Sequence, residues 1–85
     1  MVKYSITLSK RAQKQLDKLS DYLASPVIRA IQNLANDPRP QGYKKLKGRD
    51  GYRIRIGDYR VIYEVYDSIL LVDVIELGNR KEIYD

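Results

Sequence analysis

Residues 52–66, YRIRIGDYRVIYEVY, contain two runs of alternating apolar and polar residues on either side of Gly57-Asp58. This pattern predicts two antiparallel strands joined by a two-residue turn. The register that follows pairs Ile56 with Tyr59, Arg55 with Arg60, Ile54 with Val61, Arg53 with Ile62 and Tyr52 with Tyr63.

The two faces of this predicted hairpin differ sharply. One face is apolar and suits a core; it carries Tyr52, Ile54, Ile56, Tyr59, Val61, Tyr63 and Val65. The other carries Arg53, Arg55 and Arg60. Arg55 directly opposes Arg60, and such a like-charge pair costs a few tenths to about 1 kcal/mol in a sheet. A sequence that retains this repulsion predicts an anion on that face.

Composition limits the classes of protein and of site. The chain has 85 residues, 44% of them hydrophobic and 32% charged, which is typical of one small soluble domain, residues 1–85. No apolar run approaches the roughly 18 residues of a membrane-spanning helix, and the Met1 end lacks a signal-peptide pattern, so we expect a cytoplasmic protein with no membrane partner. Cys and His are both absent. Disulfides, thiol catalysis and histidine-based triads are therefore excluded, and we expect no metal site and no cofactor.

Positive charge is concentrated in residues 42–60. This stretch holds two acids, Asp50 and Asp58, against seven basic residues: Lys44, Lys45, Lys47, Arg49, Arg53, Arg55 and Arg60. The remaining residues, nine basic and nine acidic, sum to zero. Such a segment is typical of a phosphate-binding surface. We expect Lys44, Lys45, Lys47 and Arg49 to attract RNA nonspecifically, with solubility as the alternative reading.

The N-terminal half predicts a strand and two helices. Residues 2–8 alternate as a half-buried strand, and Ser9 can cap a helix that begins at Lys10. Its apolar stripe contains Ala12, Leu16, Leu19 and Leu23, and its outer row of Lys10, Lys14 and Lys18 is a solvated face or a contact for RNA or an acidic partner.

Ser25-Pro26 is a signal for the start of a second helix, with Ser25 as its cap. Its predicted buried stripe is Val27, Ile31 and Leu34. A short link at residues 22–25 predicts a helical hairpin, and one bent helix is the alternative. Residues 36–42 are rich in turn formers and end the helical region.

The C-terminal half predicts more strands. In residues 43–49 we expect Leu46 to anchor on the core while the lysines stay in water. Asp67-Ser68 marks a turn, and residues 69–77, ILLVDVIEL, predict a strand buried on both sides over part of its length. Gly78-Asn79 should end it, before a tail at residues 80–85.

These elements together predict an α+β domain of two layers. An antiparallel-rich sheet with an N-terminal strand would have both helices packed on its apolar face. The arginines would then occupy the opposite, open face, and the tail would bring Arg80 and Tyr84 onto the same surface.

The run KLKGRDGYRIRIGDYRVIYEV, followed at a distance by ELGNRKEIY, resembles the RelE branch of the RelE/ParE superfamily of toxins. The resemblance covers essentially the whole chain and implies a RelE-like fold. It also implies a ribosome-dependent endonuclease that cuts mRNA in the ribosomal A site. The implied partners are a cognate antitoxin, which holds the toxin inactive, and the ribosome with its mRNA and rRNA.

The resemblance also implies roles for individual residues. The family's two basic strand positions fall on Arg53 and Arg55, its arginine after the turn on Arg60, its arginine after the last strand on Arg80, and its terminal tyrosine on Tyr84. This set suits cleavage by the 2′-hydroxyl of the RNA itself, with no metal. Because arginine stays protonated, Tyr84 is the better candidate base if the guanidinium groups lower its pKa.

Other readings remain open from the sequence. Arg53 and Arg55 are ordinary solvated strand residues in one reading, and Arg60 forms an ion pair with Glu64 or Asp73 in another. The carboxylates Glu64, Asp73 and Glu76 are alternative candidates for the general acid or general base. Tyr43 and Tyr66 are candidates to stack on a nucleobase. At the level of function the alternatives are a ParE-like inhibitor of DNA gyrase and an inactive relative that binds only its antitoxin and regulates its operon.

Overall fold

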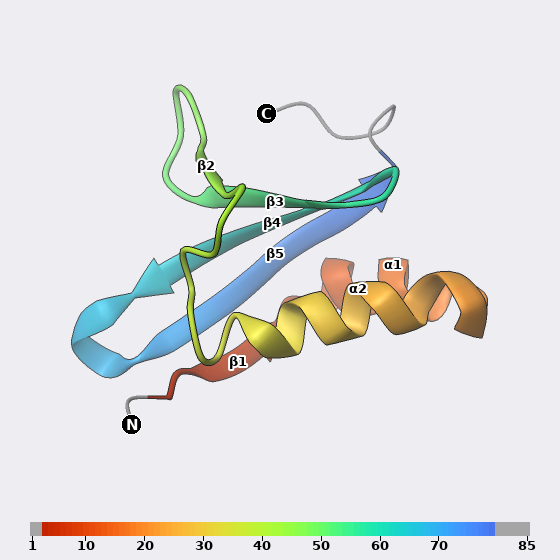
Figure 1. Cartoon of the computed structure of the whole chain (residues 1–85), viewed down its shortest axis with the longest axis horizontal. Helices are drawn as coiled ribbons and strands as arrows, with labels where there is room; N and C mark the ends of the chain where they lie inside the picture. Colours follow the sequence, from red (N-terminus) through yellow and green to blue (C-terminus); the bar gives the residue numbers. More distant parts are fainter. Residues whose placement is uncertain (1–2, 80–85) are drawn as a thin grey trace.

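A computed structural model describes residues 3–79 as one mixed sheet with two helices on one of its faces (Figure 1). The elements are β1 (Ser5–Leu8), α1 (Lys10–Asp17), α2 (Asp21–Asn33), β2 (Lys44–Lys45), β3 (Tyr52–Ile56), β4 (Tyr59–Tyr66), a 3₁₀ turn (Asp67–Ile69) and β5 (Leu71–Asn79). The strand order is β1-β5-β4-β3-β2, with β1 parallel to β5 and the other neighbours antiparallel. The predicted two-layer α+β architecture is confirmed. Neither helix has the length and apolar character that crossing a membrane requires.

The β3–β4 hairpin has the predicted register. All five pairs, including Arg55 with Arg60, face each other as the sequence pattern indicates. Gly57 has a φ of +59°, and Asp58 has no positive φ. That combination fits a type II′ turn, which requires glycine at its first central position and matches the twist of the flanking strands.

The helical hairpin has different boundaries from those expected. α1 ends at Asp17, and Ser20 rather than Ser25 caps α2, accepting a hydrogen bond from the Leu23 amide at 3.4 Å. Pro26 lies inside α2, where its missing N–H removes one backbone hydrogen bond. The earlier start is still favoured, because Asp21 in the first turn interacts well with the helix dipole. The predicted link at residues 22–25 is therefore wrong.

β5 is shifted by two residues toward the C-terminus relative to the predicted strand and contains an irregularity. Ile69 and Leu70 belong to the preceding turn, whereas Gly78 and Asn79 continue the strand by pairing with Arg60 and Tyr59. Pairing along the full length of β4 thus overrides the glycine as a strand breaker. A register shift between Ile62 and Tyr63 inserts an extra residue of β5. It explains why the buried positions are Val72, Val74 and Leu77 rather than strictly alternate residues.

The main core lies between the sheet and the helices. Its buried residues are Ala12, Val27, Ile31, Leu34, Ile54, Val61, Tyr63, Val72, Val74 and Leu77. The predicted stripe of α2 is thereby confirmed. The hydroxyl of the fully buried Tyr63 donates to the Pro38 carbonyl at 2.7 Å, so the ring adds apolar area without leaving an unpaired polar group.

A second, smaller cluster lies on the other face of the sheet. Leu46 is buried there with Ile62, and the half-buried Ile75 packs against them. Leu46 is therefore buried as predicted, but in this second cluster, and the face away from the helices is partly covered. The covering loop is closed by a hydrogen bond from the Leu46 amide to the Gly51 carbonyl at 3.0 Å.

Arg39, in the connection between α2 and β2, contacts Asp67 and Tyr52 at the edge of the core. Its guanidinium forms an ion pair with Asp67 at 2.9 Å and lies 5.2 Å over the ring of Tyr52. The Tyr4 hydroxyl also donates to Asp67, at 2.6 Å. The hydrogen bond from Arg39, followed by that from Tyr4, lowers the pKa of Asp67 below its usual value of 3.8.

Replacing Gly51 with alanine should destabilise the fold more than replacing Gly48. Gly51 has a φ of +118°, and a Cβ there would lie 3.0 Å from the Tyr63 carbonyl oxygen. Gly48 has a φ of +73° with no atom within 4 Å of the new Cβ. We expect Gly51→Ala to cost about 2–3 kcal/mol and Gly48→Ala about 1 kcal/mol in urea unfolding. Equal losses would contradict the close contact with β4.

Asp67→Asn should reduce stability in a pH-dependent way. Because the folded-state pKa of Asp67 is depressed, its charge contributes stability above the unfolded-state pKa of about 4, and that contribution is lost as the pH falls through the lower folded-state pKa. The difference in unfolding free energy between wild type and variant should thus be largest near pH 6–7 and shrink below about pH 4. A difference that is constant from pH 7 to pH 3 would exclude this role.

Candidate nucleic-acid interface

Three arginines occupy the sheet face away from the helices. Alternation along β3 and β4 places Arg53, Arg55 and Arg60 on this face. Arg55 and Arg60 are direct cross-strand partners, so their Cβ atoms lie about 5 Å apart, and Arg53 lies about 7 Å further along β3. Two guanidinium groups on neighbouring strands can bind the oxygens of one phosphate.

The three arginines differ in exposure. Arg55 is exposed and Arg60 is half-buried, but Arg53 is only 3% exposed. Arg53 lies between Lys44 on β2 and Ile62 on β4, beside the cluster that contains Leu46. The reading of Arg53 as a solvated strand residue is therefore wrong, and so is the expectation that all three side chains are exposed. A guanidinium held in such a site is more rigid than one on an open surface.

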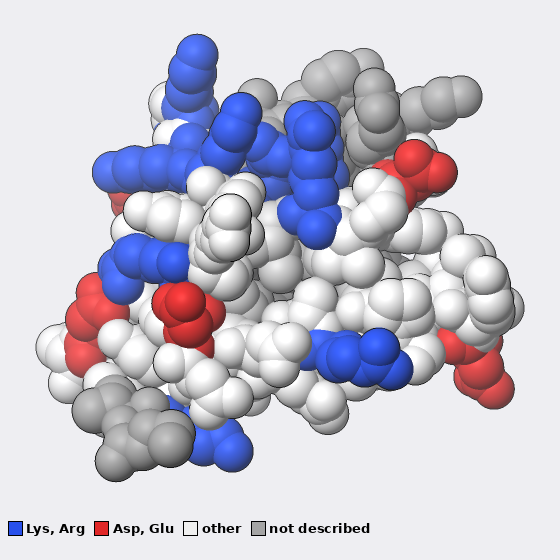
Figure 2. All heavy atoms as spheres, viewed as in Figure 1, with Lys and Arg blue, Asp and Glu red and all other residues white. Residues whose placement is uncertain are grey.

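Further cations surround this face. Lys44 and Lys45 form β2, Lys47 and Arg49 lie on the loop that follows, and all four side chains are exposed. Figure 2 shows Lys and Arg side chains gathered at the top of the view, where Figure 1 has β2 and β3. The pairing of Lys44 with Arg53 connects this basic loop to the arginine face. The sequence predicted these cations but not that Lys44 pairs beside Arg53.

The acidic residues weighed as alternatives have other contacts. Glu64 accepts a hydrogen bond from the Tyr66 hydroxyl at 2.9 Å, which raises the pKa of Tyr66, and Asp73 accepts one from Thr7 at 3.0 Å. Glu64 lies four residues from Arg60 on the same strand, about 13 Å away. The strand register therefore places Glu64, and with it its cross-strand partner Asp73, away from the Arg55–Arg60 pair.

Glu76 links the basic loop to α1. Its carboxylate lies 3.5 Å from Arg11 and 3.6 Å from Arg49. Arg11 in the first turn of α1 therefore lies near the basic loop, and the exposed Lys10, Lys14 and Lys18 lie along α1 and at its C-cap. Arg11 was not among the residues predicted for this surface, although its place beside Lys10 in a basic helix is a signal that could have found it.

The tyrosines divide as predicted between core and surface. Tyr63 is buried, and Tyr52 and Tyr59 pack against the core. Tyr43 makes an edge contact with Tyr52, the ring centroids being 5.7 Å apart. Arg80 and Tyr84 lie outside the described residues.

Within residues 3–79, no group of three or more His, Cys, Asp or Glu side chains is placed to hold a metal ion. The described interface therefore consists of guanidinium and ammonium groups together with backbone. Such a surface can bind a phosphate backbone and stabilise negative charge.

A family model and an individual relative both match this chain over most of its length. The family described as "ParE toxin of type II toxin-antitoxin system, parDE" matches residues 6–84. The mRNA interferase toxin RelE of Escherichia coli (strain K12) is 30% identical, over 95% of this chain and 90% of that protein.

Solved structures show the same relationship. The archaeal RelE-RelB complex from Pyrococcus horikoshii OT3 contains a chain that is 29% identical, with a TM-score of 0.82 over 98% of this chain and 100% of that one. A chain of the intact E. coli RelBE toxin-antitoxin complex is 29% identical, with a TM-score of 0.78 over 89% of this chain and 95% of that one. From its sequence, its fold and its relatives, the chain belongs to the RelE family of toxins, within the RelE/ParE superfamily of type II toxin-antitoxin systems.

Proposed function

We propose that this toxin is an endoribonuclease that cuts mRNA in the A site of the ribosome, in the cytoplasm, and so inhibits translation. The observation that carries the proposal is the opposed pair of Arg55 and Arg60 beside the buried Arg53. Two cations held face to face by a strand register make a site for an anion, and a phosphate diester is the anion that their geometry suits.

In the proposed reaction the 2′-oxygen of the RNA attacks the adjacent phosphorus, and the bond to the 5′-oxygen of the next nucleotide breaks. The products are a 2′,3′-cyclic phosphate and a 5′-hydroxyl. Arg53, Arg55, Arg60 and Arg80 stabilise the charge on the phosphate. Tyr84, as its phenolate, accepts the proton of the 2′-hydroxyl, and the leaving 5′-oxygen takes a proton from water. The roles of Arg80 and Tyr84 rest on the family resemblance. Loss of one charge-stabilising group of this kind typically costs about 10²-fold to 10³-fold in rate.

The relatives support the substrate and the partners of this proposal. The E. coli relative carries the name mRNA interferase toxin, and the two solved complexes pair RelE with RelB. We therefore propose that mRNA on the ribosome is the substrate, that Lys44, Lys45, Lys47 and Arg49 strengthen binding to rRNA or mRNA backbones, and that a cognate antitoxin holds the toxin inactive.

Arg55→Gln should increase stability while it reduces cleavage. Removing the charge opposite Arg60 relieves repulsion, so the free energy of unfolding should rise by a few tenths to about 1 kcal/mol. Single-turnover cleavage of ribosome-bound mRNA should fall about 10²-fold to 10³-fold. Lys47→Gln is the control, since it removes one exposed charge with no cross-strand cation and should change stability by less than about 0.5 kcal/mol. If Arg55→Gln cleaves as fast as Lys47→Gln, the arginine pair does not hold the scissile phosphate.

Primer extension on cellular mRNA after induction tests the function as a whole. Wild-type toxin should produce cuts confined to translated regions, and Tyr84→Phe should lose them because it cannot accept the 2′-hydroxyl proton. Growth arrest with intact mRNA and with DNA damage would instead identify an inhibitor of DNA gyrase. A protein without either effect would be a relative that acts only through its antitoxin.

A further inference from the structure

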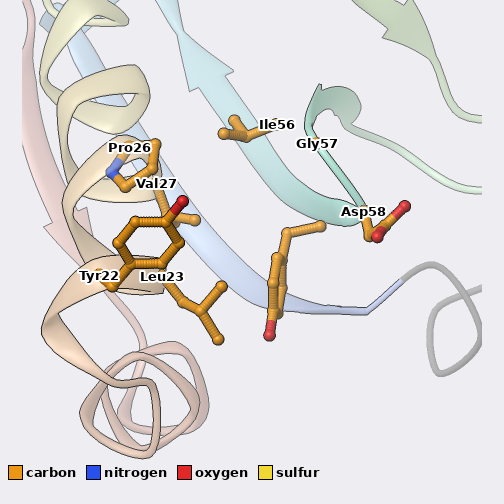
Figure 3. Close-up of a pocket in the computed structure, with 8 residues that line it drawn as sticks. Tyr22, Leu23, Pro26, Val27, Ile56, Gly57 and Asp58 are labelled. Atoms are coloured by element: carbon orange, nitrogen blue, oxygen red, sulfur yellow. The ribbon is translucent and has the colours of Figure 1, made fainter.

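An apolar pocket of about 360 Å³ lies between α2 and the tip of the β3–β4 hairpin. Tyr22, Leu23 and Pro26 line it from the helix, and Ile56, Asp58 and Tyr59 line it from the hairpin. Figure 3 shows the helical side chains across the hollow from Ile56 and the Gly57-Asp58 turn. The pocket is separate from the arginine face, because Ile56 and Tyr59 point to the opposite side of the sheet from Arg55 and Arg60.

The helical wall of this pocket exposes large apolar side chains. Tyr22 is 87% exposed and Leu23 is 40% exposed. Tyr22 therefore contributes little to the toxin's own core. An aromatic ring beside an apolar hollow is typical of a surface that buries a partner's side chain.

The charges of the pocket exclude a nucleic-acid backbone. Among the described residues that line it, Asp58 carries a charge and none is lysine or arginine. A phosphate would be repelled by Asp58 and would find no cation among these lining residues. An apolar group of a polypeptide would instead be buried against Leu23, Pro26 and Ile56.

The pocket is also close to the proposed site of cleavage. Ile56 and Tyr59 form the cross-strand pair next to the turn, and Arg55 and Arg60 form the next pair along the same strands. A chain anchored in the pocket that crosses the hairpin tip can reach the arginine pair within about four extended residues, or roughly 13 Å. Acidic side chains on that chain would meet two opposed cations.

We propose that this pocket binds an apolar anchor residue of the cognate antitoxin, and that acidic residues a few positions away on the antitoxin then bind Arg55 and Arg60. The proposal rests on the toxin-antitoxin function above and adds the site and the chemistry of the contact. The antitoxin thereby occupies the place of the phosphate, while its apolar anchor supplies affinity that RNA cannot obtain from the same surface.

The double variant Tyr22→Ser/Leu23→Ser tests the anchor. We expect its affinity for the antitoxin encoded with the toxin to fall at least 10-fold by calorimetry, because truncated anchors in such pockets are typical hot spots. Its cleavage of ribosome-bound mRNA should equal that of wild type, since neither residue lies on the arginine face. In cells, co-expressed antitoxin should rescue growth less well from the variant than from the wild type.

Ile69→Ser is the matched control. Ile69 is 67% exposed and lies in the 3₁₀ turn between β4 and β5, so its replacement removes exposed apolar surface elsewhere and should leave antitoxin affinity unchanged. Thermal unfolding monitored by circular dichroism verifies that both variants are folded.

Three results would overturn the proposal. The first is unchanged antitoxin affinity in the double variant. The second is a free toxin that sediments as a dimer and becomes a monomer in the double variant with antitoxin affinity unchanged, which would assign the pocket to a second copy. The third is a loss of mRNA cleavage with normal antitoxin binding, which would assign it to RNA. If wild-type toxin itself cleaves no mRNA, the proposed function fails, whereas the affinity measurement still tests the pocket.

Discussion

The two-residue turn at Gly57-Asp58 fixes the register of the β3–β4 hairpin, and the candidate interface depends on that register. A slip of one residue would turn every side chain of one strand to the other face. Val61 and Tyr63 would then leave the core, and Arg60 would enter it. The cost of burying an unpaired guanidinium in that core therefore holds Arg60 on the outer face opposite Arg55. A single strand register thus sets both which residues enter the apolar core and which face carries the arginines.

Charged residues at the two ends of β4 have neighbours of different sign. Where β4 meets the 3₁₀ turn, Asp67 is paired with Arg39 and accepts a further hydrogen bond from Tyr4. At the other end, Arg60 faces a like charge. The like-charge pair across β3 and β4 costs up to about 1 kcal/mol, and the proposed binding of a phosphate gives this pair a function. The burial of Arg53 is compatible with the proposed role, since a partly desolvated guanidinium interacts more strongly with a phosphate than a solvated one.

Local patterns predicted the hairpin, the two layers and the apolar stripe of α2, because each depends on residue spacing within one element. They failed where two local signals compete and where distant segments decide the outcome. Ser20 and Ser25 are both competent helix caps, and sequence alone does not rank them. The extra residue in β5 and the second cluster around Leu46 depend on how the loop after β2 packs on Ile62 and Ile75. Arg53 is buried for the same reason. The pocket beside Tyr22 was missed because its two walls come from α2 and from the hairpin tip.

The two residues before the Gly57-Asp58 turn and the two residues after it form an apolar pair and a charged pair that point to opposite faces of the sheet. Ile56 and Tyr59 offer apolar surface toward α2, and Arg55 and Arg60 offer charge toward the other face. RNA can use only the charged side, whereas a polypeptide with an apolar residue and acidic neighbours can use both. An anionic partner bound at the arginine pair would reduce the repulsion between Arg55 and Arg60, and ligands that bind the folded state stabilise it. In the proposed scheme, the same positive charge on Arg55 and Arg60 that binds a phosphate would also bind an acidic segment of the antitoxin.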